Sequence, residues 1–191
     1  MPYKNYRKGF VRKGHILIAQ PFMLDPHFRR SVILICDHSR DEGTVGFVLN
    51  KIFASKVNDL IEDFPDFDAD IYYGGPVGND NIFYVHNVGD LLEESIEVMP
   101  GVWWGGNFDK LKFLIKSELI KPNNIHFFVG YSGWSPGQLE EELDTGSWVI
   151  SEMHPNYMFK SKPKHLWKQT LKNKGKTYTV IAQMPDTYNL N

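Results

Sequence analysis

The stretch GWSPG at positions 133–137 matches Gly-x-Ser-x-Gly, the turn on which many serine hydrolases hold their nucleophile between a strand and a helix. The setting fits, because a strand pattern precedes the serine and a helix pattern follows it. Chain order also permits a triad, with Asp144 and then His154 or His165 downstream of Ser135. One hypothesis is therefore a serine-dependent hydrolase that uses Ser135.

The residue after the serine argues against this chemistry. In such turns that residue donates its backbone N–H to the oxyanion hole, and here it is Pro136, which has no N–H. Losing one such donor costs about 3 kcal/mol of transition-state stabilisation. A structural interpretation explains more of the letters: Ser135 at N-cap, Pro136 at N1 and Gln138 at N3 form a capping box, and Gly146 ends the helix. The sequence favours this helix start over a nucleophile.

Few other polar residues have a possible chemical role. In LDPHFRRS (24–31), Asp25 before Pro26 can cap a single turn, and structural pairing with the arginines that follow is favoured. The same residues could equally mark an anion-binding or catalytic corner. The seven histidines are scattered without the H-x-x-x-H spacing of metal ligands on one helix face, so we expect no metal site.

Three glycine clusters follow aromatic residues, in the stretches YYGGP (72–76), WWGG (103–106) and GYSGW (130–134). Glycine beside a bulky ring indicates a backbone bend or a close approach. None of the three fits a P-loop or a dinucleotide-binding fingerprint. They are plausible walls of a small-molecule crevice, because such sites combine aromatic walls with a few polar groups.

These residues must be positioned by strands and helices whose patterns are readable. Short apolar runs bounded by turn signals predict strands, and apolar residues at helical spacing predict helices. The expected strands are 15–19, 31–37, 44–50, 70–75, 81–87, 124–132, 147–153 and 177–184, of which the second and third form a hairpin. The expected helices are one or two turns within 57–64, a helix over 108–119 with Asn107 as its cap, a short helix from 136, and a helix over 163–172. Strict strand–helix alternation is missing, so the fold class is α+β with a mixed sheet.

The composition is that of one globular domain. A chain of 191 residues with 42% hydrophobic and 23% charged residues can bury a core unaided, and the single Cys36 excludes an internal disulfide. The formal net charge of −2 lacks the basic footprint of a dedicated nucleic-acid binder. No signal-peptide core opens the chain, and no apolar run reaches the roughly 20 residues of a membrane helix. We therefore expect a cytoplasmic protein with no membrane partner.

Several separated segments, taken in order, carry a family resemblance; they are ILIAQPFMLDPHFRRSVILICDHSRDEGTVGFVLN, YYGGPV, VWWGGNFDKL, FFVGYSGWSPGQLEEELDTGSWVI and PDTYNLN. Together they resemble the YqgE/AlgH family over nearly the whole chain, from about Gly14 to Asn191. The resemblance implies a strongly bent, bifurcated mixed sheet that forms a pseudo-barrel with flanking helices. We expect one domain over 1–191, with 1–13 as a loosely attached N-terminal segment. The sequence departs from the family at Lys51-Ile52, where Arg-Pro is usual.

Functionally, the resemblance implies no shared enzymatic activity or cofactor, although one branch of the family is described as a transcriptional regulator. The leading hypothesis is a non-enzymatic binding or regulatory protein without a cofactor, whose partner is an unknown small molecule or protein. A hydrolase using Ser135 and a DNA-binding transcriptional regulator remain alternatives, although the net charge disfavours nucleic acid. We expect the signature corners to line one crevice, formed by Asp25, Asn50, Gly74, Gly75, Pro76, Trp104, Gly105, Gly133, Trp134, Gln138 and Glu142.

Overall fold

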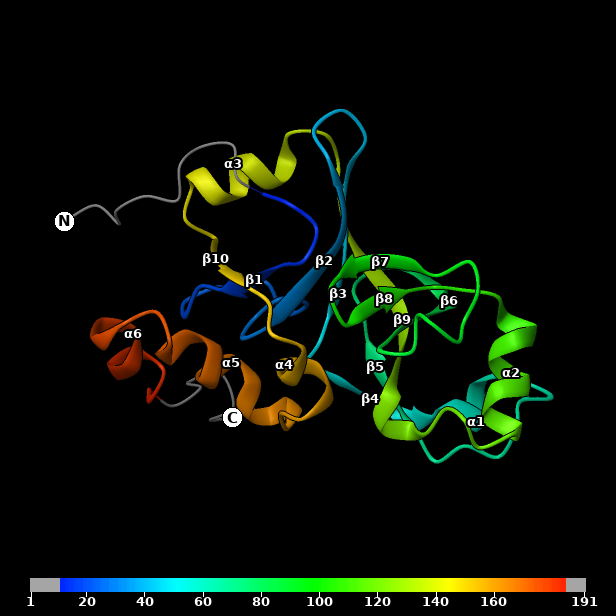
Figure 1. The fold of residues 1–191 in the computed structure, drawn as a ribbon. Coiled ribbons are helices and arrows are strands. Elements are labelled where there is room, and N and C mark those ends of the chain that lie inside the picture. Colours follow the sequence, from blue (N-terminus) through cyan, green and yellow to red (C-terminus); the bar gives the residue numbers. More distant parts are fainter. Residues whose placement is uncertain (1–10, 185–191) are drawn as a thin grey trace.

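The computed structural model describes residues 11–184, and these fold into one ten-stranded sheet with helices packed around it (Figure 1). The strands are β1 (His15–Ala19), β2 (Val32–Ser39), β3 (Gly43–Val48), β4 (Ile52–Lys56), β5 (Asp70–Tyr73), β6 (Val77–His86), β7 (Ile96–Met99), β8 (Val102–Trp104), β9 (Ile125–Trp134) and β10 (Trp148–Glu152). The helices are α1 (Val57–Leu60), α2 (Phe108–Lys116), the 3₁₀ turn η1 (Pro122–Asn124), α3 (Gln138–Asp144), α4 (Pro155–Phe159), α5 (Pro163–Lys172) and α6 (Lys176–Ile181).

The sheet forks at β9. Its main path runs β10-β1-β2-β3-β9-β6-β8-β7, and every pairing along it is antiparallel. β6 lies along one edge of β9, whereas the other edge carries β5 beside its first half and β3 beside its last residues. β5 runs parallel to β9 and pairs on its far side with β4. The α+β class and the bent, bifurcated mixed sheet are thereby confirmed, with the sheet curled into a half-barrel.

Three apolar clusters fill the space between the sheet and its helices. Alternate residues of β1 and β2 point to opposite faces, so these strands are buried on both sides. One face packs under α3, and the other packs against α4, α5 and α6 (Figure 1). The third cluster lies between β5, β6, β9 and the helix α2, at the opposite end of the molecule. The helices therefore cover three separate parts of one continuous sheet.

Gly74 stands at the fork and joins its branches. Its N–H donates to the carbonyl of Val129 on β9 (2.9 Å), and its carbonyl accepts from the N–H of Val48 on β3 (3.0 Å). A Cβ atom at position 74 would collide with the carbonyl oxygen of Gly130. The backbones are too close here for any side chain, which explains the glycine in this corner.

Most expected elements are present, including the β2–β3 hairpin and the helix capped by Asn107, whose Oδ1 accepts from the N–H of Lys110 (3.0 Å). Of the one or two helical turns expected within 57–64, the structure has one, α1. The sequence patterns did not predict β4, β7, β8 or α4, which are all five residues or shorter. Unlike β1, an equally short strand whose residues are all buried, these elements are partly exposed, so no buried apolar run identifies them in the sequence.

The expected terminal strand over 177–184 is wrong, because this segment contains the helix α6. The β-branched residues of the segment favour a strand locally. In the structure Tyr178 and Ala182, four residues apart, share a helix face that packs with the α4–α5 side of the core, while Val180 is exposed. Tertiary packing on α5 thus overrides the local preference.

The first segment is described only from Val11 onward. Val11 packs against the cluster under α3, and the Nζ of Lys13 donates to the carbonyl of Glu97 (3.0 Å). Residues 1–10, most of the expected N-terminal segment, lie outside the described residues. Among the helices between positions 11 and 184, none has the length and apolarity needed to cross a membrane.

The fork predicts a difference between two glycine-to-alanine substitutions. Gly74→Ala should lower the free energy of unfolding by more than about 3 kcal/mol, because its Cβ would clash with backbone. Gly146 has a positive φ of 80°, but no atom lies within 4 Å of the place that a Cβ would occupy, so Gly146→Ala should cost only about 1 kcal/mol of backbone strain. Urea unfolding measures both, and equal losses would contradict the close approach at the fork.

Candidate binding site

The turn that contains Asp25 is stabilised by the aspartate itself. Its carboxylate accepts from the N–H of His27 (2.8 Å), and its carbonyl accepts from the N–H groups of Phe28 (3.1 Å) and Arg29 (2.7 Å). This is the cap of a single turn that the sequence predicted. The turn belongs to the loop between β1 and β2. We name residues 21–30 of this loop, together with Lys51 and Tyr73, the loop corner.

Lys51 holds the loop in place through hydrogen bonds to its backbone. Its Nζ donates to the carbonyls of Pro26 and His27, both at 2.8 Å. Burial lowers the pKa of Lys51, the nearby Arg29 guanidinium lowers it further, and Asp25 opposes both effects. A partly buried amine thus lies beside a second cation.

Tyr73 makes the second connection to the loop. Its hydroxyl lies 2.7 Å from Nδ1 of His27, and the two rings stack with centroids 5.9 Å apart. Burial raises the pKa of Tyr73 and the charge of Asp25 raises it further, so the phenol keeps its proton. Tyr73 also donates its backbone N–H to the carbonyl of Lys51 (2.8 Å), which places both anchors side by side.

Asn50 has a structural role at the start of β2. Its Oδ1 accepts from the N–H of Val32, and its Nδ2 donates to the carbonyl of Arg30, both at 2.8 Å. Arg30 has a φ of 53°, a left-handed conformation that is uncommon for a side chain of this size. The Arg30 guanidinium lies 5.0 Å from the ring centre of Trp167 and donates to the carbonyl of Met184 (2.9 Å). Asn50 therefore holds the strained residue that leads from the loop into β2.

Trp134, Gln138 and Glu142 contact one another next to the loop, and we name these three residues the carboxylate cluster. Oε2 of Glu142 accepts from the indole N–H groups of Trp134 (2.9 Å) and Trp148 (2.7 Å), and its Oε1 accepts from the Gln138 amide (3.1 Å). Phe28 of the loop stacks on Trp134 and meets Trp148 edge-on, with centroids 6.2 and 5.5 Å apart. This carboxylate joins α3, β9 and β10 and supports the loop.

The WWGG corner lies in the other half of the sheet. The Gly105 carbonyl accepts from the imidazole of His86 (2.9 Å), and the Gly106 carbonyl accepts from the Tyr84 hydroxyl (2.5 Å). Trp104 packs edge-on against Phe47, with centroids 5.9 Å apart. These contacts hold the turn after β8 and contribute nothing to the loop corner.

The residues expected to line one crevice thus fall into several places. Asp25 lies in the loop corner with Asn50 beside it, and Gly74-Gly75-Pro76 follow directly after Tyr73. Trp134, Gln138 and Glu142 form the carboxylate cluster, which Phe28 links to the loop. Gly133 pairs with Val45 inside the sheet. Trp104 and Gly105 lie at the end of β8. A crevice shared by these residues stays a prediction.

Sequence reasoning did not assign a role to His27, Lys51 or Tyr73. His27 was noticeable only as a neighbour of Asp25, and Lys51 only as a departure from the family pattern. Their contacts join positions 24 to 46 residues apart. No local pattern predicts contacts over such separations.

The Ser135 region starts a helix, but one detail of the expected cap is wrong. The helix begins at Gln138, and its N-cap is Gly137 with a φ of 79° rather than Ser135. Only half of the capping box forms: the N–H of Ser135 donates to Oε1 of Gln138 (3.0 Å). Gly137 can adopt the left-handed conformation that the turn requires, and this moves the helix start two residues along. At the other end Gly146 closes the helix as expected, with a φ of 80°.

The histidines proposed as partners of Ser135 lie elsewhere. His154 is the N-cap of α4, where its Nδ1 accepts from the N–H of Asn156 (3.2 Å), and His165 lies on α5. In Figure 1, α4 and α5 lie on the opposite side of the strands from α3, which follows Ser135. The structure therefore does not place His154 or His165 beside Ser135.

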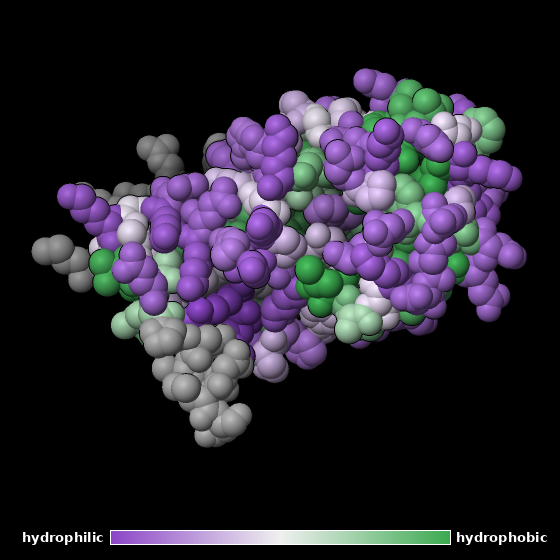
Figure 2. Space-filling view, turned by 90° about the horizontal axis from the view of Figure 1, so that it is seen from below, coloured by the Kyte–Doolittle hydropathy of each residue, from purple (hydrophilic) through white to green (hydrophobic). Residues whose placement is uncertain are grey.

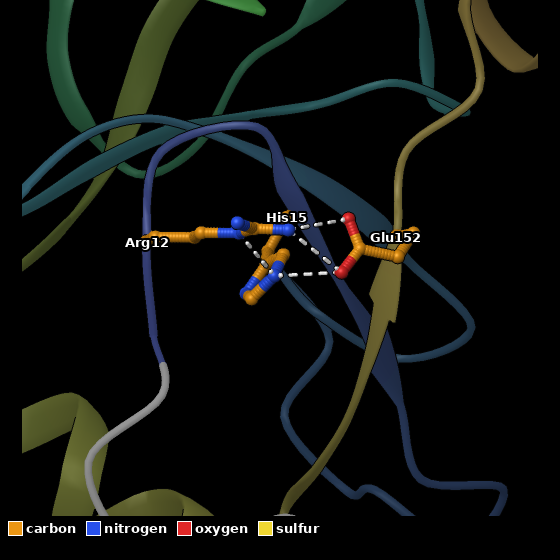
Figure 3. Close-up of polar contacts among 3 residues, drawn as sticks. All are labelled: Arg12, His15 and Glu152. Atoms are coloured by element: carbon orange, nitrogen blue, oxygen red, sulfur yellow. Dashed lines mark hydrogen bonds and ion pairs between the residues drawn. The ribbon is translucent and has the colours of Figure 1, made fainter.

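A different histidine lies in a charged cluster at the start of β1. Figure 3 shows the side chains of Arg12, His15 and Glu152 in mutual contact. Nε of Arg12 lies 2.9 Å from Nε2 of His15, Nη2 of Arg12 lies 3.0 and 3.1 Å from the two carboxylate oxygens, and Nε2 of His15 lies 3.2 Å from one of these oxygens. Burial lowers the pKa of His15, while Glu152 raises it. This cluster attaches the chain before β1 to the last strand, β10. Within residues 11–184, no three His, Cys, Asp or Glu side chains are placed to hold a metal ion.

Comparisons with known proteins agree with this architecture. A family model described as AlgH-like matches residues 16–179. A UPF0301 protein from Chlorobaculum parvum is 37% identical over 181 residues, covering 95% of this chain and 96% of its own length. A UPF0301 protein from Cytophaga hutchinsonii is 37% identical over 182 residues, covering 95% and 100%. The chain belongs to the AlgH-like family.

Solved structures show the same fold. The AlgH protein from Pseudomonas aeruginosa, solved in solution, superposes with a TM-score of 0.73 at 26% identity, covering 97% of this chain and 98% of that one. A crystal structure of a protein from Corynebacterium diphtheriae superposes with a TM-score of 0.74 at 22% identity, covering 91% and 93%. Similarity at this level identifies the architecture.

The carboxylate cluster predicts a specific loss of stability. Glu142→Ala should lower the free energy of unfolding by about 2 kcal/mol or more, because two buried indole N–H groups lose their acceptor. The matched control Glu141→Ala changes an exposed neighbour and should stay within about 0.5 kcal/mol of the parent. Denaturant unfolding followed by tryptophan fluorescence compares them. A loss of the same size in both variants would contradict the bridging role of Glu142.

The free energy of unfolding at acidic pH should depend on His126. Burial lowers the pKa of His126 to about 4, although the charge of Asp70 opposes the shift. Below about pH 6.5 the unfolded chain protonates this histidine before the folded chain does, so folding is progressively destabilised down to about pH 4. His126→Phe keeps an aromatic ring and removes the titration. The variant should therefore lose less stability than the parent between pH 7 and pH 4.5, and parallel curves would contradict the shift.

Proposed function

We propose that the chain is a non-enzymatic binding protein that docks a protein partner on the loop corner. The observation that carries the proposal is the exposure of Phe22 and Leu24, which are 74% and 72% accessible to solvent. The side chain between them, Met23, is partly buried and packs against the apolar cluster that α3 covers. Two large apolar side chains therefore project from a loop whose intervening residue is anchored.

The loop is held in place on every side. The N–H of Gln20 donates to the carbonyl of Ser147 (3.1 Å), Phe28 packs against two tryptophans, and Lys51 and Tyr73 bind the turn. Fixing a loop costs conformational entropy. A preorganised loop with exposed apolar groups suits recognition, because a partner need not order it on binding.

The charges beside Phe22 and Leu24 are mostly basic. Besides burial, which lowers the pKa of Lys51 most, the nearby Arg29 guanidinium lowers it further, while the Asp25 carboxylate raises it. Basic groups around exposed apolar side chains suit a partner surface with apolar and acidic residues. We infer a protein partner of that character.

A second group of exposed apolar residues lies at the opposite end of the molecule. Figure 2 shows green residues gathered at the right-hand end of the face seen from below, where α1 and α2 lie, on an otherwise largely purple surface. There Lys112 lies 5.3 Å from the ring centre of Phe108, and Lys110 lies 5.8 Å from that of Phe113. These ammonium groups partly cover the rings, so the α2 surface is a weaker candidate than the loop corner.

The hydrolase alternative finds little support in the geometry around Ser135. Pro136 has no N–H, and the N–H of Ser135 donates to the Gln138 side chain, so neither can serve an oxyanion hole as arranged here. Labelling with a fluorophosphonate probe tests the alternative directly. Modification of Ser135 that is abolished in Ser135→Ala would favour a hydrolase.

The DNA-binding alternative depends on the family resemblance and on the basic ends of the chain. The chain has a formal net charge of −2, which disfavours direct contact with DNA. If the chain acts as a regulator, its charge therefore fits a protein partner better than DNA. We infer action in the cytoplasm, consistent with a free, buried Cys36.

The docking proposal predicts a position-dependent crosslink. A photoreactive amino acid at position 24 should crosslink one partner in cells, and Phe22→Ser in the same chain should remove that product because it deletes an apolar contact. Val180→Ser, at an exposed apolar site elsewhere, is the matched control and should leave the product unchanged. The same crosslinker at position 113 should not give it. A product that persists in Phe22→Ser, or that forms equally from position 113, would reject the loop corner.

A further inference from the structure

A small pocket of about 140 Å³ opens where the parallel strands β5 and β9 begin. We name it the His126 pocket; it is lined by Asp68, Ala69, Asp70, Tyr72, Pro122, Ile125 and His126. None of these residues belongs to the loop corner or to the carboxylate cluster. The pocket is therefore independent of the proposed docking surface.

His126 is the unusual member of the lining. Its ring stacks on Tyr72, with centroids 4.6 Å apart and planes 13° from parallel, and Phe159 of α4 packs beside it at 5.8 Å. Its Nδ1 is buried and has no hydrogen-bond partner among residues 11–184. Buried polar atoms are normally paired, so this ring carries hydrogen-bonding capacity that the fold does not use.

The pocket rim is acidic. Asp68 and Asp70 both contact the Nζ of Lys56, at 2.9 and 2.7 Å. Two carboxylates share one ammonium group, so the rim keeps an excess of negative charge and of acceptor positions. Burial raises the pKa of Tyr72 and lowers that of His126, and the charge of Asp70 acts on both pKa values in the upward direction.

We propose that the His126 pocket binds a primary alkylammonium group. Asp70 supplies the opposite charge and an acceptor oxygen, while the neutral imidazole of His126 and the hydroxyl of Tyr72 offer further acceptors for its N–H groups. Lys56 shows that an ammonium nitrogen fits this carboxylate pair. The volume suits an amino group with a short carbon chain, from a free amine or from a lysine side chain of another polypeptide.

A divalent metal ion fits the pocket less well. Hard cations require several oxygen ligands around one point. Among the described residues no three acidic, histidine or cysteine side chains converge in that way, and Lys56 already lies between the two carboxylates. An ammonium group needs only hydrogen-bond acceptors and net negative charge.

Titration with butylammonium tests the proposal. Backbone amide NMR signals of residues 68–72 and 125–126 should shift and saturate with a dissociation constant in the millimolar range. Butan-1-ol, of the same size without charge, should leave them unchanged. Tetramethylammonium, which has charge but no N–H, should bind at least about tenfold more weakly because it cannot donate hydrogen bonds.

Variants of the lining connect these shifts to the pocket. Asp70→Asn should weaken butylammonium binding at least about tenfold, and His126→Phe should weaken it several-fold while keeping the ring stack. Asp90→Asn, an exposed acid on the connection between β6 and β7, is the control and should bind as the parent does. Thermal unfolding of each variant verifies that it is folded.

Two ligands distinguish a free amine from a lysine side chain as the source of the ammonium group. A short peptide with one lysine, blocked at both ends, is compared with butylammonium under the same conditions. Binding of either ligand that depends on Asp70 supports the pocket, and the stronger ligand identifies the source. Shifts that butan-1-ol reproduces, shifts that survive in Asp70→Asn, or no shifts at all would overturn the proposal.

Discussion

The shared strand β9 is the constraint on which the rest of the structure depends. It carries β6 on one edge and, on the other, β5 and then β3 in succession. Two strands can use one edge only if the first ends where the second begins, and the backbones must then pass very close. Gly74 satisfies this condition, because it bonds to β3 and β9 at the point where β5 stops. The curvature of the sheet and the separation of its apolar clusters both follow from this junction.

Many of the residues that resemble the family signature hold this architecture together and leave little chemistry unused. The Gly105 carbonyl is bound by His86, Asn50 bridges Arg30 and Val32, and Glu142 joins two indoles. The side chains left exposed are on the loop that these contacts support, as Phe22 and Leu24 show. The signature therefore describes a rigid support, and the recognition that we propose depends on what the support presents.

The extent to which the sequence predicted these features depends on the range of each interaction. The cap at Asn107, the turn at Asp25 and the glycine after α3 involve neighbours within four residues, and all three are as expected. The contacts of Lys51 with the loop and of Tyr73 with His27 join distant segments, so no local pattern identified those residues. The segment containing α6 shows the converse, since its local β preference gave way to packing on α5. Pairing of β5 with β9 instead of its sequence neighbour β6 is likewise a property of the whole sheet.

The Arg12–Glu152 contact joins residues 140 positions apart, and β1 pairs with β10 across a similar separation. Between them lies the entire half of the sheet built from β4 to β9, which is one uninterrupted stretch of chain. During synthesis that inner half can fold as soon as β9 has left the ribosome. The outer half must wait, with one edge of β1 unpaired, until residue 152 has emerged. The order of translation thus makes the inner half the scaffold on which the outer half, including the loop corner, is completed last.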